Sequence, residues 1–315
     1  MEEKVYFISS DIHSFFDEWY TSLQSNGFDI KNPNHIIVIC GDIFDRGTQP
    51  LEVYNFLRSI PKERRILIRG NHESLLNELV KRGFPESHDN HNGTYDTLIQ
   101  ISGEMSEIDF RRYMFEKYYS KTPKLDFIYD KNDNDVDYSD EYQNFSDKVV
   151  AEISERQKRI FNNQKLKEIL NWINSDEWVN YYETKDYIFV HSWIPVKKYI
   201  DWEKSLASGY FIYSKDDEYR DDWHNATEDE WNDAMWGCPW KRAKEGLNKT
   251  GKTIVCGHWH TSDFFNNLRN KNSIKKYDIT NNPIYKSKRY KLIGLDTCTV
   301  VTHKVNCLVL KESEL

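Results

Sequence analysis

The alternation of short apolar runs with segments of helical periodicity is the sequence feature that most constrains the fold. Nearly continuous apolar runs are typical of strands that are buried on both faces, and strand–helix–strand order is typical of an α/β fold. Apolar residues at helical spacing predict helices over Phe15–Ser25, Pro50–Ser59 and Ser74–Arg82. The predicted strands are Lys4–Ser9, His35–Cys40, Arg65–Arg69, Tyr187–Val190, Thr253–Cys256, Tyr290–Leu295 and Lys304–Leu310.

Two segments interrupt this alternation, and we interpret them as insertions. Residues 85–182 contain no convincing core strand but have good helical stretches over Glu107–Tyr119 and Asp147–Ile173, which predicts a helical cap. Residues 197–250 are acidic and rich in tryptophan. Within them, Thr227-Glu-Asp-Glu230 predicts a capping box at the start of a short helix.

Charge and composition argue against several classes of protein. The 43 basic and 51 acidic side chains leave a net charge of −8, which disfavours a nucleic-acid partner, since nucleic-acid-binding domains tend to be basic. No apolar run approaches the roughly 20 residues that a membrane-spanning helix needs, so no membrane partner is expected. The five cysteines are far apart and form no Cys-x-x-Cys pair. We therefore expect no disulfide framework, and we expect a cytoplasmic location.

Polar clusters follow five of the predicted strands, at the point where each strand ends. Each cluster taken alone is typical of something simpler: a capped turn, a hydrogen-bonded core histidine such as His191, or a helix N-terminus capped by Asn71. In α/β sheets, however, ligands gather beyond the carboxyl ends of the strands, so five such clusters together indicate one shared site. In chain order they are Asp11-Ile-His13, Gly41-Asp42-Ile-Phe-Asp45-Arg46-Gly47, Gly70-Asn71-His72-Glu73, His191 and Gly257-His258-Trp-His260.

These residue types are suited to a pair of metal ions. Carboxylate and imidazole together favour Mn, Fe or Zn over Ca or Mg alone. A carboxylate between two ions about 3.5–4 Å apart can bridge them, and such a pair clamps a phosphoryl group and turns a bridging water into hydroxide near neutral pH. A histidine held by a carboxylate would return a proton to the leaving oxygen. An arginine fork would hold the phosphate oxygens.

In this order the clusters resemble the motifs of the calcineurin-like metallophosphoesterases. The Asp45-Arg46-Gly47 and Arg69-Gly-Asn-His-Glu73 details are similar to the phosphoprotein phosphatase branch, especially its bacterial and phage members. The likeness extends nearly from end to end, because Asn92-Gly-Thr and Leu295-Asp-Thr-Cys298 also resemble stretches of the bacterial enzymes. The resemblance implies an α/β (α+β) fold in which a β-sandwich is flanked by helices.

The resemblance also implies a role for each matching residue. His72 would be the general acid, oriented by Asp45, while Arg46 would grip the phosphate and Asn71 would also contact the substrate. Two divalent metal ions per chain are implied, and among Mn, Fe and Zn we expect Mn to support activity. One ion would be held by Asp11, His13, Asp42 and His260, and the other by Asp42, Asn71, His191 and His258.

The sequence departs from the pattern of the family at four places. Ser14 stands where the family usually has Gly, and Cys298 replaces the Gly of an Asp-Thr-Gly stretch. His260 is a second histidine where the protein phosphatases usually have Gly-His-Thr, and it is typical of the wider family. Trp236-Gly-Cys238 occupies the position of a Trp-x-Arg, so the second phosphate-binding arginine is absent there and Arg242 is a candidate substitute.

Residues 1–315 are therefore predicted to form one catalytic domain that acts on a phosphorylated substrate by attack of a hydroxide that bridges the two metal ions. A serine/threonine protein phosphatase is the leading hypothesis, and a hydrolase of dinucleoside tetraphosphates or other nucleotides is the alternative. A scaffold protein that binds metal without turnover is a third hypothesis, against which the His72–Asp45 pair argues. The oligomeric state is left open.

Two weaker patterns have two interpretations each. Asp130–Glu141 is close to an EF-hand calcium loop but has Asp135 in place of the required glycine, so a solvated acidic loop is favoured. The other pattern is a series of tryptophans that could line a groove for a peptide or a base, or pack an insertion against the core: Trp223, Trp231, Trp236 and Trp240.

Overall fold

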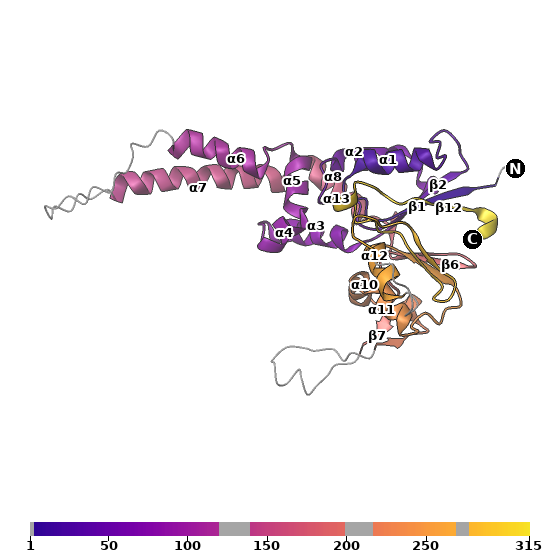
Figure 1. Ribbon diagram of the computed structural model, residues 1–315. Coiled ribbons are helices and arrows are strands. Elements are labelled where there is room, and N and C mark those ends of the chain that lie inside the picture. The colour runs from indigo at the N-terminus through magenta and orange to yellow at the C-terminus, as the bar shows by residue number, and fades with distance from the viewer. Residues whose placement is uncertain (1–2, 120–138, 199–216, 269–276) are drawn as a thin grey trace, which may run out of the picture.

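The computed structural model describes residues 3–119, 139–198, 217–268 and 277–315, and two five-stranded sheets lie at its centre (Figure 1). The first sheet has the order β12 (Leu308–Lys311), β1 (Val5–Ser9), β2 (His35–Cys40), β3 (Arg65–Ile68) and β4 (Trp178–Val179). The second has the order β10 (Tyr285–Ser287), β11 (Leu292–Gly294), β9 (Thr253–Cys256), β6 (Tyr187–Val190) and β5 (Tyr181–Glu183). A small third sheet pairs β7 (Val196–Lys197) with β8 (Glu218–Tyr219).

Within each large sheet most strands run in the same direction. Strands β1 to β4 are parallel, as are β6, β9 and β11. Strands β12, β5 and β10 pair antiparallel with their neighbours at the sheet edges. The two sheets pack face to face through an apolar cluster, so the expected β-sandwich is present, and its mostly parallel arrangement places the ends of the central strands together.

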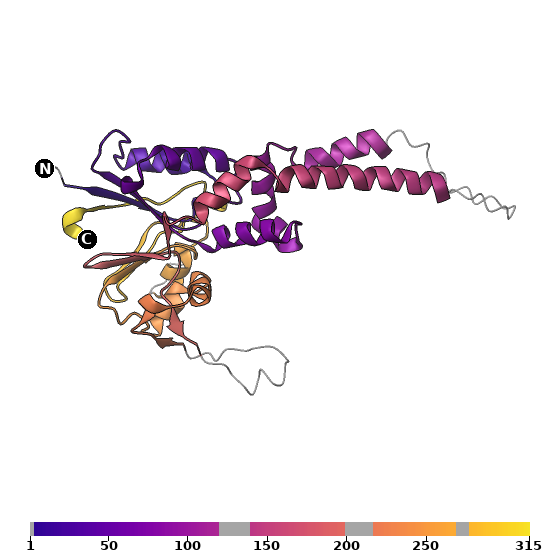
Figure 2. The ribbon, with the colours of Figure 1, turned by 180° about the vertical axis from the view of Figure 1, so that it is seen from behind.

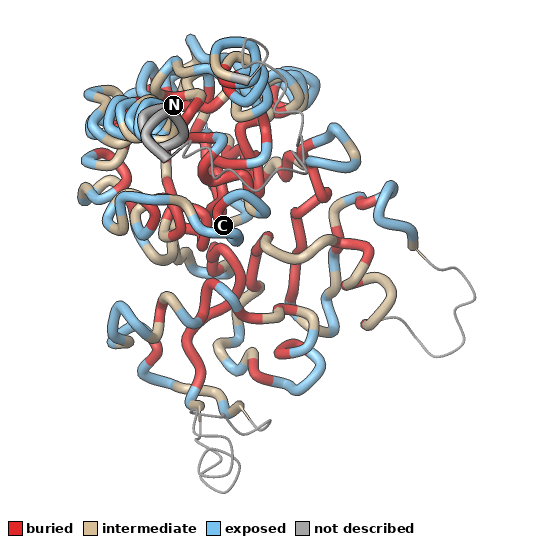
Figure 3. The backbone as a smooth tube through the Cα atoms, turned by 90° about the vertical axis from the view of Figure 1, so that its left-hand side faces the viewer, coloured by how far each residue is buried: buried red, intermediate tan, exposed pale blue. Residues whose placement is uncertain are grey.

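The central strands are buried on both faces, as their continuous apolar runs predict. Along β2, Ile36 and Val38 pack between the two sheets against Phe189 of β6, whereas Ile37 and Ile39 face the helices on the outer side. Buried backbone accordingly runs through the middle of the molecule in Figure 3. A shift of one residue would exchange the two faces, so this double burial fixes the strand register.

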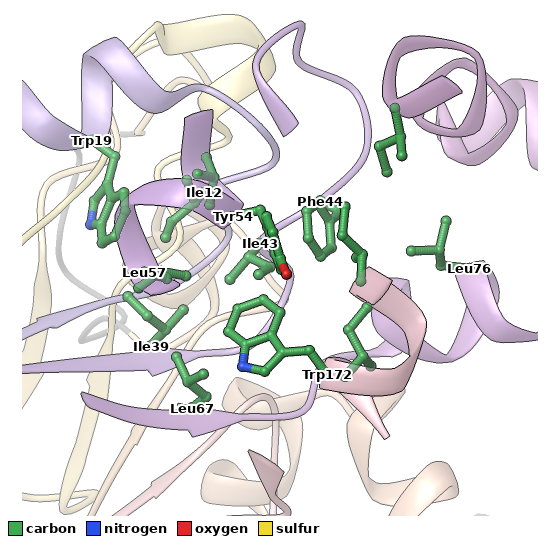
Figure 4. Close-up of a cluster of buried hydrophobic side chains, with 14 of the residues drawn as sticks. Ile12, Trp19, Ile39, Ile43, Phe44, Tyr54, Leu57, Leu67, Leu76 and Trp172 are labelled. Atoms are coloured by element: carbon green, nitrogen blue, oxygen red, sulfur yellow. The ribbon is translucent and has the colours of Figure 1, made fainter. Parts of the chain in front are cut away.

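Helices cover the outer face of the first sheet, where they form the largest apolar cluster (Figure 4). Trp19, Leu57, Leu76 and Trp172 come from four different helices and meet the strands in this cluster. Each such fully buried side chain contributes about 1.5–3 kcal/mol to the free energy of unfolding. The helices are α1 (Phe16–Ser25), α2 (Pro50–Ser59), α3 (Asn71–Arg82), α5 (Thr94–Ser102) and α8 (Gln164–Ile173).

A second group of helices covers the outer face of the other sheet (Figures 1 and 2). Trp231 and Phe264 of these helices pack against Ile254 of β9 and Leu292 of β11. The three helices are α10 (Glu228–Met235), α11 (Pro239–Lys244) and α12 (Thr261–Asn267). Helices therefore flank both sheets, in agreement with the expected architecture.

Part of residues 85–182, the predicted helical cap, forms an arm that projects from the body of the molecule (Figures 1 and 2). Arg156 holds the two sides of the arm together: its guanidinium donates to Glu107 at 2.7 Å and to the Met105 carbonyl at 2.6 Å, and lies 4.2 Å from the ring centre of Phe110. The arm consists of α6 (Glu107–Met114), a π-helical turn (Phe115–Tyr119) and α7 (Ser139–Phe161), and the short helix α4 (Ser87–Asn92) lies closer to the body.

The structure corrects three predicted boundaries in the first two thirds of the chain. Helix α3 begins at Asn71 rather than at Ser74, and Gly70, not Asn71, is its N-cap. The helical stretch over Asp147–Ile173 is two helices, because the Asn163 side chain accepts backbone N–H groups of the next helix and starts α8 there. Residues 85–182 do contain a core strand, since Trp178 of β4 pairs with Leu67 at the edge of the first sheet.

The two C-terminal strands are shorter than predicted. Strand β11 covers only Leu292–Gly294, and β12 begins at Leu308 after the single-turn helix α13 (Thr299–Thr302). Asn306 explains the late start of β12, because its side-chain amide donates to the carbonyls of Asn282 and Leu295 instead of leaving the segment to a strand ladder.

Three further expectations concern the insertions and their surroundings. The capping box at Thr227 is confirmed, with the Glu230 N–H donating to the Thr227 hydroxyl at 3.3 Å and the Thr227 N–H donating to Glu230 at 2.7 Å. The pattern that resembles a calcium loop begins at Asp130, in a segment outside the described residues. Among the described residues we find no helix whose length and apolar character would let it cross a bilayer.

Candidate metal centre

The polar clusters that follow the strands meet at one edge of the two sheets. The first cluster contacts the last, because the N–H of His258, which follows β9, donates to the carboxylate of Asp11, which follows β1, at 3.0 Å. The clusters after β3 and β6 also meet, with His191 Nε2 lying 2.8 Å from Asn71 Oδ1. Within each sheet the carboxyl ends of the parallel strands lie at the same edge, and because the two sheets pack against each other these two edges meet.

The Asp42 carboxylate lies at the centre of this site. Its Oδ2 is 3.4 Å from Nε2 of His191 and 3.9 Å from Nε2 of both His13 and His72. A carboxylate common to two groups of ligands is the arrangement that a bridged pair of metal ions needs. Two such groups, each with ligand atoms within 4.8 Å of one another, share Asp42: His13, Asp42 and His72, and Asp42, His191 and His258.

Two of these histidines are oriented by backbone carbonyls. His13 Nδ1 lies 3.0 Å from the Phe44 carbonyl oxygen, and His191 Nδ1 lies 2.9 Å from that of Cys40. A carbonyl oxygen can only accept, so Nδ1 carries the proton in each ring and Nε2 presents its lone pair toward Asp42. This is how proteins usually prepare a histidine to bind a metal ion.

Burial and the neighbouring charges together favour an ionised Asp42 and neutral forms of His13 and His258. Burial alone would raise the pKa of Asp42, but the four surrounding histidines hold that pKa well below its usual value. Burial, together with His191, lowers the pKa of His258 to about 3. Burial, with His72 and Arg46, places the pKa of His13 well below its usual value. Ionised carboxylate and neutral imidazole are the forms that bind metal ions.

For two further carboxylates next to Asp42, burial outweighs the favourable interactions and raises the pKa. Burial raises the pKa of Asp11 well above its usual value, and the negative charges of Asp296 and Asp42 raise it further. Burial also raises the pKa of Asp296. Three buried carboxylates at one site are costly without cations, so the donor set fits divalent ions that bind nitrogen and oxygen.

Glu73 fixes the loop that carries Asp42. Its buried carboxylate accepts the N–H groups of Asp42, Ile43 and Gly70 at 3.0, 2.9 and 2.8 Å. Gly70 permits the close approach of the two loops, because a Cβ at that position would overlap the Asp42 carboxylate. Glu73 thereby links the start of α3 to the loop after β2, which carries Asp42.

The loops of the site have strained backbone. Of the ten non-glycine residues with positive φ in the described part of the chain, seven lie in the loops after β1, β2 and β9. Each such residue costs about 1–3 kcal/mol, and strain of this kind is typical of functional sites. The seven are Asp11, His13, Ser14, Asp42, Asp45, Arg46 and His258.

His72 forms a hydrogen-bonded pair with Asp45 beside the two ligand groups. His72 Nδ1 lies 2.7 Å from Asp45 Oδ2, and the Thr94 hydroxyl donates to the same oxygen at 2.7 Å. Both His72 and Asp45 are buried. Arg46 is exposed at the rim of the site, with its Nη2 3.3 Å from His72 Nε2.

Some predicted site residues lie apart from the two ligand groups. Asp11 and His260 belong to neither group, so their roles as ligands remain predictions. His260 is half-buried at the start of α12, where its charge acts on Asp296. Arg242 is buried, forms an ion pair with Asp217 at 3.5 Å and packs under Gly237, so it is engaged inside the protein.

Three residues of the site received no role from the sequence. Glu73 occupies the N3 position of α3, where a glutamate is a known capping signal. Asp296 follows strand β11, so the rule that polar residues at strand ends gather at a site would have found it. Thr94, which supports Asp45, belongs to the Asn92-Gly-Thr stretch that resembles the bacterial enzymes, but that resemblance implied no role for it.

The sequence profile of the calcineurin-like phosphoesterases matches residues 5–262, so the chain belongs to this family of metal-dependent phosphoric ester hydrolases. Among curated proteins the chain is similar to the asymmetrical bis(5'-nucleosyl)-tetraphosphatase PrpE of Bacillus subtilis (strain 168). The two are 28% identical over 131 residues, which cover 39% of this chain and 53% of the relative. The chain therefore spans about half the length of the relative that it matches.

Solved structures with a similar fold include two kinds of phosphatase. One is a cold-active protein tyrosine phosphatase of a Shewanella species, with 15% identity, a TM-score of 0.47, and coverage of 99% of this chain and 76% of that one. Another is a protein serine/threonine phosphatase from Saccharomyces cerevisiae, with 13% identity, a TM-score of 0.41, and coverage of 93% of this chain and 66% of that one.

Replacing Ser14 with glycine should stabilise the protein. Ser14 has a φ of 59° and a buried hydroxyl that lacks a hydrogen-bond partner, and glycine would relieve both costs. We expect the free energy of unfolding in urea to rise by about 1 kcal/mol. The control is Ser22→Gly within α1, which should lower it by about 0.5 kcal/mol, since glycine weakens a helix. A loss of stability in Ser14→Gly would contradict the interpretation.

Removing metal ions should destabilise the protein, because the buried carboxylates of Asp11, Asp42 and Asp296 would lose their counter-charges. We expect chelation to lower Tm by about 5–10 °C and Mn to restore it. Elemental analysis of Asp42→Asn should show fewer than two ions per chain, whereas Asp45→Asn, which removes a buried carboxylate outside the two ligand groups, should keep two. Two ions per chain in Asp42→Asn would exclude a bridging role for this residue.

Proposed function

We propose that this centre hydrolyses phosphate esters with the help of two divalent metal ions. The observation that carries the proposal is the Asp42 carboxylate shared by two ligand groups, with the His72–Asp45 pair beside it. When bound, the ions would polarise the phosphoryl group and supply a nucleophilic water near neutral pH. The mixed oxygen and nitrogen donors favour Mn, Fe or Zn, and we expect Mn to support activity.

The ligand assignment extends the two groups by the predicted neighbours of each. Asn71 lies 2.8 Å from His191 and would join the second group, while Asp11 and His260 would complete the first. His72 belongs to the first group by distance, but its hydrogen bond to Asp45 suits it better to proton transfer than to metal binding. One ion would then be held by Asp11, His13, Asp42 and His260, and the other by Asp42, Asn71, His191 and His258.

Arg46 and His72 would act directly on the substrate. The exposed Arg46 guanidinium has the geometry to bind two phosphate oxygens and stands next to His72. Because Asp45 binds Nδ1 of His72, Nε2 is the atom that would protonate the leaving oxygen. Burial opposes a charged His72, but the charge of Asp42 and the hydrogen bond that His72 donates to Asp45 outweigh it and raise the pKa of His72. A protonated imidazole is the form that a general acid requires.

Two classes of substrate are compatible with the proposed centre. A serine/threonine protein phosphatase follows from the Asp45-Arg46-Gly47 and Gly70-Asn71-His72-Glu73 motifs. Hydrolysis of dinucleoside tetraphosphates is favoured by the similarity to PrpE, which carries that activity in its name, and by Arg242, which is buried instead of reaching for a phosphate.

The five cysteines, all free thiols, favour a reducing compartment such as the cytoplasm.

The proton-donor role of His72 can be tested by varying the leaving group. In His72→Asn, kcat for an alkyl phosphate should fall by about 10²–10⁴-fold. The loss for p-nitrophenyl phosphate should be much smaller, because nitrophenolate leaves without a proton. Steady-state kinetics with added Mn would measure both. The matched control is His88→Asn, since His88 lies in α4 and pairs only with Glu86 and Asp89 among the described residues.

Equal losses on both leaving groups would contradict the role of His72 as an acid. A panel of phosphopeptides, dinucleoside polyphosphates and cyclic nucleotides, assayed with Mn, would then separate the two substrate classes. Activity on none of these compounds, in protein shown to contain two ions per chain, would overturn the proposed function.

A further inference from the structure

Trp236 is an exposed aromatic side chain at the edge of the candidate metal centre. It follows α10 directly, and 53% of its surface is exposed. The centre of its ring system lies 5.8 Å from that of His258, and the two rings are perpendicular. His258 belongs to one of the two ligand groups, so Trp236 stands next to the position where a phosphate would bind.

The segment that carries Trp236 is fastened to the strands that carry the candidate ligands. The carbonyl of Gly237 accepts a hydrogen bond from the Ser192 hydroxyl at 2.7 Å and another from Trp259 Nε1 at 3.0 Å. Ser192 directly follows His191, and Trp259 directly follows His258. The position of Trp236 is therefore tied to the same two strand ends as those two histidines.

The inner side of this segment is also supported. Trp231 and Ala234 of α10 are buried in the apolar cluster of the second sheet. The guanidinium of Arg242 packs against Gly237 so closely that a Cβ there would overlap it. Arg242 thus supports the buried side of this segment instead of binding the phosphate directly.

Packing explains the neighbouring tryptophans but not Trp236. Trp223 and Trp231 are buried in the apolar cluster of the second sheet. Trp236 contributes little to that cluster and instead presents its ring at the site. A rigidly held, exposed aromatic ring beside a polar centre is a surface on which a flat ligand ring can stack.

We propose that Trp236 is a stacking platform for a planar aromatic ring carried by the leaving group of the substrate. This rests on the proposed phosphoesterase function and narrows its substrates to nucleotides or aryl phosphates in preference to aliphatic phosphomonoesters. Stacking on an aromatic side chain requires no particular pattern of hydrogen bonds, so the platform selects the presence of a ring more than its identity.

The test compares the selectivity of Trp236→Ala and Trp236→Phe with that of the wild type. The substrates are a dinucleoside tetraphosphate, phenyl phosphate and glycerol phosphate, assayed with Mn. In Trp236→Ala, the ratio of kcat/KM for a ring-bearing substrate to that for glycerol phosphate should fall about tenfold, mainly through KM. Trp236→Phe should retain most of the ratio. A fall confined to the tetraphosphate identifies a nucleobase as the ring, and a fall confined to phenyl phosphate identifies an aryl ester.

Phe115→Ala is the matched control, because Phe115 is 61% exposed but lies on the projecting arm. It should leave the ratio unchanged. An unchanged ratio in Trp236→Ala, or an equal loss on all three substrates, would overturn the inference and leave the phosphoesterase function standing.

A binding measurement separates the two proposals. Adenosine monophosphate should quench tryptophan fluorescence in the wild type, and Trp236→Ala should lose that quenching and bind the nucleotide about tenfold more weakly. Wild-type protein that hydrolyses none of the substrates but shows this quenching would overturn the phosphoesterase function alone. Quenching that is equal in the two proteins would overturn the role of Trp236.

Discussion

The buried carboxylate of Asp42 and the four histidines around it are the interaction on which the rest of the site depends. An ionised carboxylate in an apolar interior needs favourable partners, and the histidines that surround Asp42 (His13, His72, His191 and His258) lower its pKa. These histidines follow strands of both sheets, so the residues around Asp42 come from the two halves of the sandwich. The remaining imbalance, from Asp11 and Asp296, is what divalent cations would neutralise.

Such a dense site requires strained and closely packed backbone, and contacts in the surrounding structure offset the free energy of that strain. Glu73 accepts three backbone N–H groups and so holds the left-handed turn at Asp42 in place. The apolar clusters on both faces of the first sheet stabilise the fold, and this stabilisation offsets the strain in the loops. The segment around Gly237 is attached to the same strand ends by hydrogen bonds, so a side chain from an insertion becomes part of the site. In the proposed function, catalytic chemistry and substrate selection would therefore be carried by different parts of the chain.

Much of the fold could be predicted because its signals are local. The runs at His35–Cys40, Tyr187–Val190 and Thr253–Cys256 are strands with the predicted boundaries, since a strand buried on both faces is apolar throughout. The errors occur where a distant contact decides the outcome. Asn71 begins a helix because Glu73 binds Gly70, and β4 is a strand only because Trp178 meets the edge of the first sheet. Because β4 is only two residues long, its sequence is too short to show a strand pattern of its own.

The sequence by itself determined which side chains are available for chemistry and that they follow the strands in a fixed order. It also determined the family, because the residue types and their spacing are a local record of that chemistry. Only the tertiary structure decided that Glu73 binds the loop that carries Asp42, that Arg242 is buried under Gly237 and that Trp236 stands beside His258. These relations join residues far apart in the chain, and they depend on how the two sheets stack and on which loops the insertions touch. No local pattern of apolar and polar residues encodes those distances.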